Sequence, residues 1–425
     1  MKILQICAGD FFSTYGGGQV YVKNLVDAFL NQRFVNLDVI SFIDGITKRE
    51  NKVYKSVKLH EVPEDISEEA LSELIGAIAP DVIHAHSHKR MVCSVGYAKG
   101  IPVVVTAHHG GLWCPAGTAM NYKDEICTKK INHKDCLPCV LRNTRTGLSC
   151  WYPLMKHLSL GTYIKLGNYL SKKNFIPFIT PIGGSALHIQ RKKQEWKEIA
   201  EKCTVIIAPS YRMAEAMEAN GMPADKIKVI SHGIPKPVVK PPFPDIENGK
   251  IKFFYTGRIC YVKGIHILLE AFSCIKNPYI ELHLIGGAGN KKEKLYQNRL
   301  CEKYAADKRI IWHGKISPEK VYGEISDLHI AVSPSIYLEA FGLNIAEALA
   351  LGKPVISTHS GGGDIQVIDG ENGWLVNSND IKSLQQKFKD ILRMNQEDLY
   401  RISNNCNSKY LFEHVSELMN VYKGL

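Results

Sequence analysis

The sequence predicts an α/β protein built from two doubly wound parallel sheets, each in a domain of its own. The chain has 425 residues. A single hydrophobic core rarely serves a chain of this length, so two domains are expected. Short apolar runs alternate with helical stretches in two separate series. A proline-rich segment lies between the series, where neither a helix nor a central strand can form.

The first series occupies residues 1–233. Because helical stretches separate its runs, we expect consecutive strands to lie parallel, as in a Rossmann-like sheet. This N-terminal domain carries a cysteine-rich insertion at about residues 110–150. Its predicted strands are residues 2–7, 37–42, 81–86, 102–106 and 204–208.

The second series occupies residues 251–404 and predicts a second Rossmann-like domain. Residues 234–250 are the predicted linker, because five prolines fall within residues 234–245. Residues 405–425 are predicted to form a helix that crosses back to the first domain. The predicted strands of this half are residues 252–255, 281–285, 310–312, 328–332 and 354–357.

The start of the chain and its hydropathy predict a cytoplasmic protein. Met1 leads directly into a predicted strand, without the charged region and long apolar stretch of a signal peptide. A stretch of about 20 uninterrupted apolar residues is absent, so we expect no spanning helix. Membrane contact, if it occurs, is expected to be peripheral.

Positive charge is concentrated in one region. The formal net charge is +11, and in residues 140–200 ten Lys or Arg oppose only Glu195 and Glu198. Aromatic residues are interleaved with these cations. The pattern suits an anionic membrane or a phosphorylated acceptor, and it suits a solvated helix face equally well. We expect no nucleic-acid partner.

The most specific motif is a pair of carboxylates, Glu339 and Glu347, separated by seven residues after a predicted strand. A helix is predicted to begin near Phe341 and to end at Gly352. The free amides of its first turn and the helix dipole favour a diphosphate or sugar oxygens. Both carboxylates are expected at the same end of the sheet.

This segment resembles the paired-glutamate motif of glycosyltransferase family four, a family of retaining enzymes with the two-domain GT-B fold. Phe341, Gly342 and Leu343 stand where that family has them. The resemblance implies that the segment binds a nucleoside-diphosphate sugar. Glu347 would hold the ribose hydroxyls, and Glu339 would touch the donor sugar.

The segment from Gly257 to Gly264 resembles another part of the same family. Arg258 and Lys263 follow a predicted strand, where two cations can bind a diphosphate and stabilise the charge of a leaving group. By the resemblance both have this role. Gly314 and Lys315 match the loop that lies near the nucleotide base, largely through backbone groups.

Two further resemblances fall in the N-terminal domain. Gly17 and Gly18 belong to a glycine run before a predicted helix, where the backbone can approach a phosphate or sugar closely. His108, at the end of a predicted strand, matches a histidine beside the donor sugar in the family. His109 departs from the acidic residue that many members carry, so its role stays open.

Twelve cysteines in a cytoplasmic chain argue against a disulfide framework. Cys114, Cys127, Cys136 and Cys139 are clustered and end in a Cys-x-x-Cys pair. Four thiolates could hold a structural zinc ion, with free thiols as the equal alternative and an iron–sulfur cluster as a lesser one. Cys150 is an unplaced fifth candidate.

Together these motifs predict a glycosyltransferase that moves a hexose or N-acetylhexosamine to a glycan or lipid-linked acceptor in cell-surface polysaccharide assembly. His108, Arg258, Lys263 and Glu339 are the predicted catalytic residues. No Asp-x-Asp motif is present, so no catalytic metal is expected. The alternatives are another GT-B enzyme, such as a nucleotide-sugar epimerase or a phosphorylase, and a non-catalytic subunit that binds a glycolipid.

Overall fold

A computed structural model describes residues 1–12, 17–32, 35–143, 159, 161–162, 165, 169, 180–246 and 249–425 of the chain. The chain divides into two compact units. Unit 1 comprises Met1–Lys123, Cys127–Ile230 and Val415–Leu425, and unit 2 comprises Asp124–Ile126 and Ser231–His414. Within the described chain no helix is both long and apolar enough to span a membrane.

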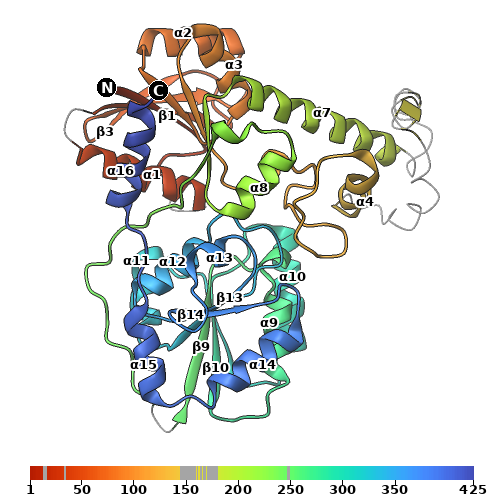
Figure 1. Ribbon diagram of the computed structural model, residues 1–425, viewed down its shortest axis with the longest axis vertical. Coiled ribbons are helices and arrows are strands. Elements are labelled where there is room, and N and C mark those ends of the chain that lie inside the picture. The colour runs from red at the N-terminus through yellow and green to blue at the C-terminus, as the bar shows by residue number, and fades with distance from the viewer. Residues whose placement is uncertain are drawn as a thin grey trace. The chain divides into compact units, whose positions relative to one another are not determined.

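Unit 1 is built on an eight-stranded sheet in the order β3-β4-β2-β1-β5-β6-β7-β8 (Figure 1). All neighbouring strands are parallel except β3 and β4, which form an antiparallel hairpin at one edge. The central strands are buried on both faces, as parallel strands covered by helices must be. The elements are β1 (Lys2–Ala8), α1 (Gly17–Leu30), β2 (Asn36–Ile43), β3 (Glu50–Tyr54), β4 (Val57–Pro63), α2 (Glu68–Ile78), β5 (Val82–Ala85), α3 (Lys89–Lys99), β6 (Val103–Thr106), η1 (Gly110–Leu112), α4 (His133–Asn143), α7 (Thr180–Lys202), β7 (Val205–Ala208), α8 (Tyr211–Ala219), η3 (Ala224–Lys226) and β8 (Ile227–Val229).

Unit 2 is built on a six-stranded parallel sheet in the order β11-β10-β9-β12-β13-β14. In chain order this is the 3-2-1-4-5-6 arrangement of doubly wound sheets, and the winding reverses between β9 and β12. Ligands of such sheets bind outside the carboxyl ends of the strands at that reversal. The elements are β9 (Ile251–Thr256), η5 (Tyr261–Lys263), α9 (Ile265–Ser273), β10 (Ile280–Ile285), α10 (Lys291–Lys303), β11 (Ile310–Gly314), α11 (Pro318–Ile325), β12 (Ile330–Ser333), α12 (Leu343–Ala350), β13 (Val355–Thr358), α13 (Gly362–Gln366), β14 (Gly373–Val376), α14 (Ile381–Ile391) and α15 (Gln396–Asn405). The helix α16 (Leu411–Lys423) follows, and its part from Val415 on belongs to unit 1.

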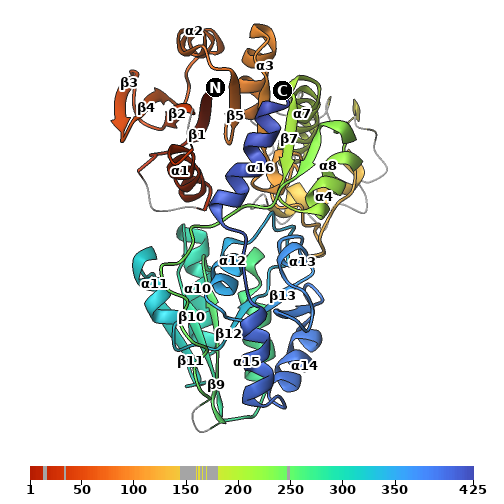
Figure 2. The same cartoon turned by 60° about the vertical axis from the view of Figure 1, so that its left-hand side comes forward.

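The last helix packs on unit 1. Figures 1 and 2 show α16 in blue beside α1, and its residues Val415, Leu418 and Tyr422 belong to the hydrophobic core that α1 and β1 also line. The sequence prediction placed the start of this helix at residue 405. In the structure α15 ends at Asn405, and a short connection separates it from α16, which begins at Leu411. The predicted start of the last helix is therefore wrong.

Candidate active site

The loops after β9 and β12 pack closely together at the carboxyl edge of the second sheet. Gly264 has a φ of +70°, and a Cβ there would stand 1.9 Å from the carbonyl oxygen of Pro334. Only glycine therefore permits this contact. The Ile336 amide donates to the Val262 carbonyl at 2.9 Å, so the two loops are fixed against each other.

Lys263 and Glu339 form an ion pair between these loops. The Glu339 Oε1 atom accepts hydrogen bonds from the Lys263 ammonium and, at 3.2 Å, from the Tyr337 hydroxyl. The Oε2 atom accepts from the Ser335 hydroxyl at 2.5 Å. Sequence reasoning identified the ion-paired residues but missed both hydroxyls, because Ser and Tyr in a loop give no distinctive pattern.

The pKa values of the pair are shifted in the directions that keep both groups charged. Burial alone would raise the pKa of Glu339, but Lys263 and the two hydroxyls hold it below its ordinary value. Burial alone would lower the pKa of Lys263, but the charge of Glu339 raises it. An ammonium and a carboxylate, both largely removed from water, therefore stay charged together at the carboxyl edge of the second sheet.

Glu347 has a different environment although it belongs to the same motif. It lies in α12, about one turn after the helix begins. In the described chain its carboxylate takes part in no hydrogen bond or ion pair, and burial raises its pKa to about 7. Glu347 thus offers unused acceptor atoms in a sparsely polar setting.

The start of α12 differs from the prediction. Gly342 has a φ of +82° and is the N-cap, so the helix begins at Leu343 and not near Phe341. The Phe341 ring is buried against His232, and its carbonyl accepts a hydrogen bond from Gln366. The Phe341 side chain therefore packs inside the unit, in a cluster with Ala346 and Ala350 of α12.

Arg258 lies in the loop directly after β9. Its guanidinium forms a 3.6 Å ion pair with Glu293 and is more than half exposed, and its carbonyl accepts from the Tyr255 hydroxyl at 2.7 Å. Gly286, after β10, has a φ of +136°, and a Cβ there would stand 1.8 Å from the Gly257 carbonyl oxygen. The loops after β9 and β10 are therefore also packed backbone to backbone.

Gly314 and Lys315 lie at the same edge of the sheet. Gly314 is the last residue of β11, has a φ of +75°, and its carbonyl accepts from the Gly286 amide at 2.8 Å. Lys315 is exposed, and its Cγ would stand 2.9 Å from a Cβ built on Gly287. The second unit thus gathers Arg258, Lys263, Gly314, Lys315 and Glu339 on the loops of one edge.

In the first unit, His108 follows β6 and lies among buried aromatic and polar side chains. Its Nε2 atom is 3.0 Å from His86 Nδ1, and His86 Nε2 is 2.8 Å from Gln5 Oε1. Tyr21 packs edge-on against both imidazoles. Sequence reasoning missed these supporting residues, because each of them reads as part of a strand or helix.

The other predicted residues of the first unit lie nearby in the fold. Gly17 and Gly18 are the first residues of α1, and the residues just before them lie outside the described part. His109 is the N-cap of η1, and its Nδ1 accepts from the Gly111 amide at 3.0 Å. Desolvation of the ring, with the charges of Lys89 and Lys192, lowers the pKa of His109, although the residue as a whole is exposed.

The described structure adds no support for the structural zinc ion, which stays a prediction beside the equal alternative of free thiols. Cys114, Cys127, Cys136 and Cys139 are free thiols, and burial raises the pKa of Cys136 to about 12 and that of Cys139 to about 11. Among the residues that are described, no group of three or more His, Cys, Asp or Glu could hold a metal ion. Burial therefore favours the protonated form of Cys136 and Cys139. Cys150 lies outside the described residues.

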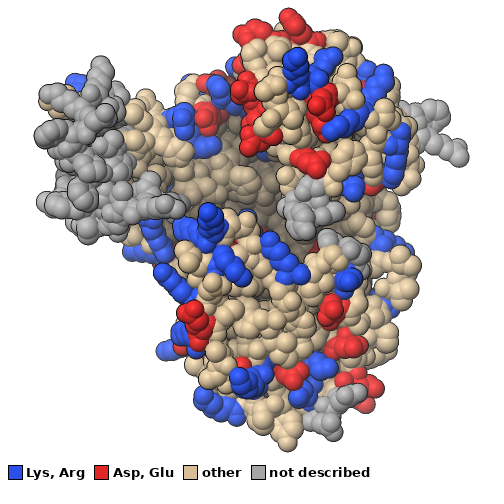
Figure 3. Space-filling model, turned by 180° about the vertical axis from the view of Figure 1, so that it is seen from behind, with Lys and Arg blue, Asp and Glu red and all other residues tan. Residues whose placement is uncertain are grey.

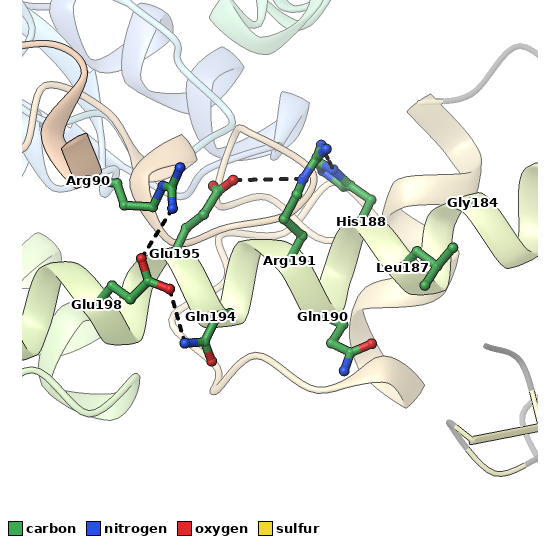
Figure 4. A pocket seen from close by; sticks show the side chains of 9 residues that line it. All are labelled: Arg90, Gly184, Leu187, His188, Gln190, Arg191, Gln194, Glu195 and Glu198. Carbon is green, nitrogen blue, oxygen red and sulfur yellow. Dashed lines mark hydrogen bonds and ion pairs between the residues drawn. The ribbon is translucent and has the colours of Figure 1, made fainter. Parts of the chain in front are cut away.

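A groove of about 660 Å³, lined largely by charged and amide residues, lies between α3 and α7 of the first unit (Figure 4). Arg90 and Arg191 reach into it, and each is paired with a glutamate: Arg90 with Glu198 at 3.3 Å and Arg191 with Glu195 at 3.7 Å. None of the predicted site residues lines this groove. Its charges already neutralise one another, so we give the groove no role in the chemistry.

About half of the basic segment predicted at residues 140–200 lies outside the described part of the chain. Within α7, Arg191, Lys193 and Lys197 are exposed. Figure 3 shows charges of both signs on the face in view, with Lys and Arg the more numerous. The described part therefore shows cations at the surface of α7 but does not test membrane contact.

The fold is that of the GT-B class, with two Rossmann-like units. Residues 240–408 match the family described as "Glycosyl transferases group 1". A solved structure of Anabaena Alr3699/HepE in complex with UDP is similar over 100% of both chains, with a TM-score of 0.65 and 16% sequence identity. Sucrose-phosphate synthase from Thermosynechococcus elongatus covers 100% of this chain and 98% of its own, with a TM-score of 0.67 and 18% identity.

Curated relatives are similar over part of their length. The putative colanic acid biosynthesis glycosyltransferase WcaL of Escherichia coli (strain K12) is 24% identical over 239 residues, or 53% of this chain and 57% of the relative. The uncharacterized glycosyltransferase MJ1607 of Methanocaldococcus jannaschii is 27% identical over 257 residues, or 54% of this chain and 62% of the relative. The chain therefore spans about three fifths of the length of these relatives.

Proposed function

We propose that this protein is a retaining glycosyltransferase of family four. It moves a hexose or N-acetylhexosamine from a nucleoside-diphosphate sugar to a glycan or lipid-linked acceptor. The observation that carries the proposal is the charged pair Lys263–Glu339 at the reversal point of the second sheet. Relatives named for colanic acid, capsular polysaccharide and lipopolysaccharide synthesis support a role in cell-surface polysaccharide assembly.

The donor is proposed to bind along the loops of the second sheet. Arg258, Lys263 and the first amides of α12 take the diphosphate, since cations and helix N-termini both favour anions. Glu347 accepts hydrogen bonds from the ribose hydroxyls, for which its carboxylate has free acceptor atoms. Glu339 accepts from hydroxyls of the sugar, and the backbone near Gly314 faces the base.

The reaction breaks the bond between the anomeric carbon and the diphosphate oxygen. Arg258 and Lys263 stabilise the negative charge that gathers on the departing diphosphate. The acceptor hydroxyl attacks from the same face, and its proton passes to a diphosphate oxygen, so the anomeric configuration is retained. His108 and the start of α1 at Gly17 and Gly18 are proposed to contact the donor from the first unit.

The acceptor is proposed to be membrane-associated. The exposed cations of α7 are Arg191, Lys193 and Lys197, of which Arg191 and Lys197 also form exposed ion pairs with Glu195 and Glu201 at 3.7 and 3.6 Å. Such cations suit an anionic membrane surface, where each contributes about 1 kcal/mol of binding. The protein would then bind peripherally at the cytoplasmic face. Binding to vesicles with anionic lipid that vanishes at high salt is the expected result, and salt-independent binding contradicts it.

Donor binding is tested first by thermal unfolding in the presence of a panel of nucleoside-diphosphate sugars. One donor at about 100 times its Kd is expected to stabilise the wild type by about 2.7 kcal/mol. Glu347→Ala and Arg258→Ala should lose that stabilisation, whereas Glu302→Ala and Arg299→Ala, on the exposed face of α10, should keep it. A panel with no stabilising donor refutes the proposal.

A further inference from the structure

Glu339 is held by more donors than an ion pair requires. Oε1 accepts from Lys263 and Tyr337, and Oε2 accepts from Ser335. When Lys263 turns to a diphosphate, each oxygen still keeps one hydroxyl donor. We infer that Ser335 and Tyr337 are positioning residues that hold Glu339 for the donor sugar while Lys263 binds the diphosphate. This inference rests on the proposed function.

Ser335 is fixed independently of the ligand. Its side chain is buried, with 1% of its surface exposed. Its carbonyl accepts hydrogen bonds from the Thr358 hydroxyl at 2.6 Å and the Ser378 hydroxyl at 3.3 Å. The backbone of Glu339 is fixed as well, because its amide donates to the Ser360 carbonyl at 2.8 Å. The backbones of Ser335 and Glu339 are therefore both fixed, and the buried Ser335 hydroxyl donates to Oε2 across this short distance.

Tyr337 contacts both members of the ion pair. Its hydroxyl donates to Glu339, and the Lys263 ammonium lies 5.5 Å from its ring centroid, within the range of a cation–π contact. Burial and the neighbouring Glu339 charge raise the pKa of Tyr337, so the hydroxyl keeps its proton and remains a donor. Tyr337 thus links the group proposed for the phosphate to the group proposed for the sugar.

The inference is tested with Tyr337→Phe and Ser335→Ala in transfer assays across pH, using the donor identified by the binding panel. Each substitution removes one hydrogen bond to a carboxylate, so kcat/KM is expected to fall about tenfold. The matched control is Tyr304→Phe, whose hydroxyl donates to Glu270 at 2.6 Å, away from the β9 and β12 loops. Affinity for the nucleoside diphosphate without sugar should be unchanged in all three variants.

The pH profile separates positioning from a loss of folding. Both hydroxyls lower the pKa of Glu339, so their removal raises it and moves the acid limb of kcat/KM to higher pH. The other titratable groups around Glu339 are Lys263, Tyr337 and Tyr255. Glu347 also titrates, but it is present in every variant. The quantity measured is therefore the shift of the acid limb relative to the wild type.

Two outcomes overturn the inference, and they differ from each other. If wild type is active and Tyr337→Phe and Ser335→Ala match Tyr304→Phe in kcat/KM and in pH profile, the positioning role is wrong and the proposed function stands. If wild type neither binds nor turns over any donor, the proposed function fails and the inference falls with it. A tenfold loss of kcat/KM in Tyr337→Phe and Ser335→Ala, with the acid limb moved to higher pH, supports the positioning role and the proposed function.

Discussion

At the scale of the residue, the two glutamates of one motif have opposite electrostatic environments. Glu339 accepts from a cation and two hydroxyls, which keep it charged. Glu347 has only burial acting on it, and its pKa rises to about 7. Environments that push two carboxyl pKa values apart are typical of sites where the two groups have different tasks.

Glu347 gives a prediction about stability and pH. Because its pKa is higher in the folded protein, the folded state binds more protons than the unfolded state between pH 4.5 and about 7. Wild-type stability should therefore fall through this window, by at most about 3 kcal/mol. Glu347→Gln cannot ionise and should not show this loss.

The measurement is the free energy of unfolding of the second unit in denaturant from pH 4.5 to pH 8. The difference between Glu347→Gln and wild type should grow up to about pH 7 and then stay constant. Glu302→Gln, on an exposed part of α10, is the control. Parallel curves for wild type and Glu347→Gln across the window would disprove the expectation.

At the scale of the element, short loops between strands and helices position the charged groups. Gly264 ends η5 and begins α9 in a left-handed conformation, and it lets the loop that carries Lys263 approach the loop that carries Glu339. Gly286 does the same between the loops after β9 and β10. The glycines therefore decide how closely the cations and carboxylates meet.

Gly264→Ala is expected to destabilise the second unit more than Gly370→Ala does. Both residues have positive φ, so both substitutions cost about 1–2 kcal/mol for placing an L side chain there. Gly370 has open space around its Cβ position, whereas a Cβ at Gly264 meets the Pro334 carbonyl oxygen at 1.9 Å. The overpacking adds about 1–3 kcal/mol.

Denaturant unfolding of the two alanine variants checks the difference, and nucleoside-diphosphate affinity checks its functional effect. Affinity should fall in Gly264→Ala, because the shifted loop displaces Lys263, and should be retained in Gly370→Ala. Equal stability of the two variants would contradict this expectation, because it would show that the loop accommodates the added methyl group at residue 264 without loss of stability.

At the scale of the whole molecule, the chain ends in the unit where it began. Leu418 and Tyr422 of α16 are buried in the core of the first unit, and the Tyr422 hydroxyl is 2.5 Å from His84 Nδ1. The preceding helix, α15, belongs to the second unit. A segment of 11 residues at the C-terminus, Val415–Leu425, therefore stabilises the N-terminal unit.

Leu418→Ala is expected to destabilise the first unit by about 2–5 kcal/mol, because it leaves a cavity in a fully buried position. Phe412→Ala, on the same helix but 62% exposed, should have little effect. Calorimetry of both variants should show a lower unfolding temperature for the first unit only in Leu418→Ala. A shift confined to the second unit would contradict the packing of α16.

The sequence by itself determined the two α/β units, the principal strands along the chain, the positions of Arg258 and Lys263 after a strand, and a helix that carries Glu347. Apolar periodicity and glycine spacing are local properties, so a linear reading can recover them. The sequence analysis missed the polar edge hairpin β3–β4 and misplaced the starts of α16 and α12. Packing against neighbouring segments determines the hairpin and α16, and the left-handed conformation of Gly342 determines where α12 begins.

Only the tertiary structure decided which side chains meet. Ser335 and Tyr337 reach Glu339, and His86 and Gln5 reach His108, through loops and strands that the sheet topology brings together. In the described part of the chain, the four cysteines considered as zinc ligands belong to no group of three or more that could hold a metal ion. Spacing along a chain limits which residues can share an element, but distances across a fold depend on packing between elements, which no local pattern encodes.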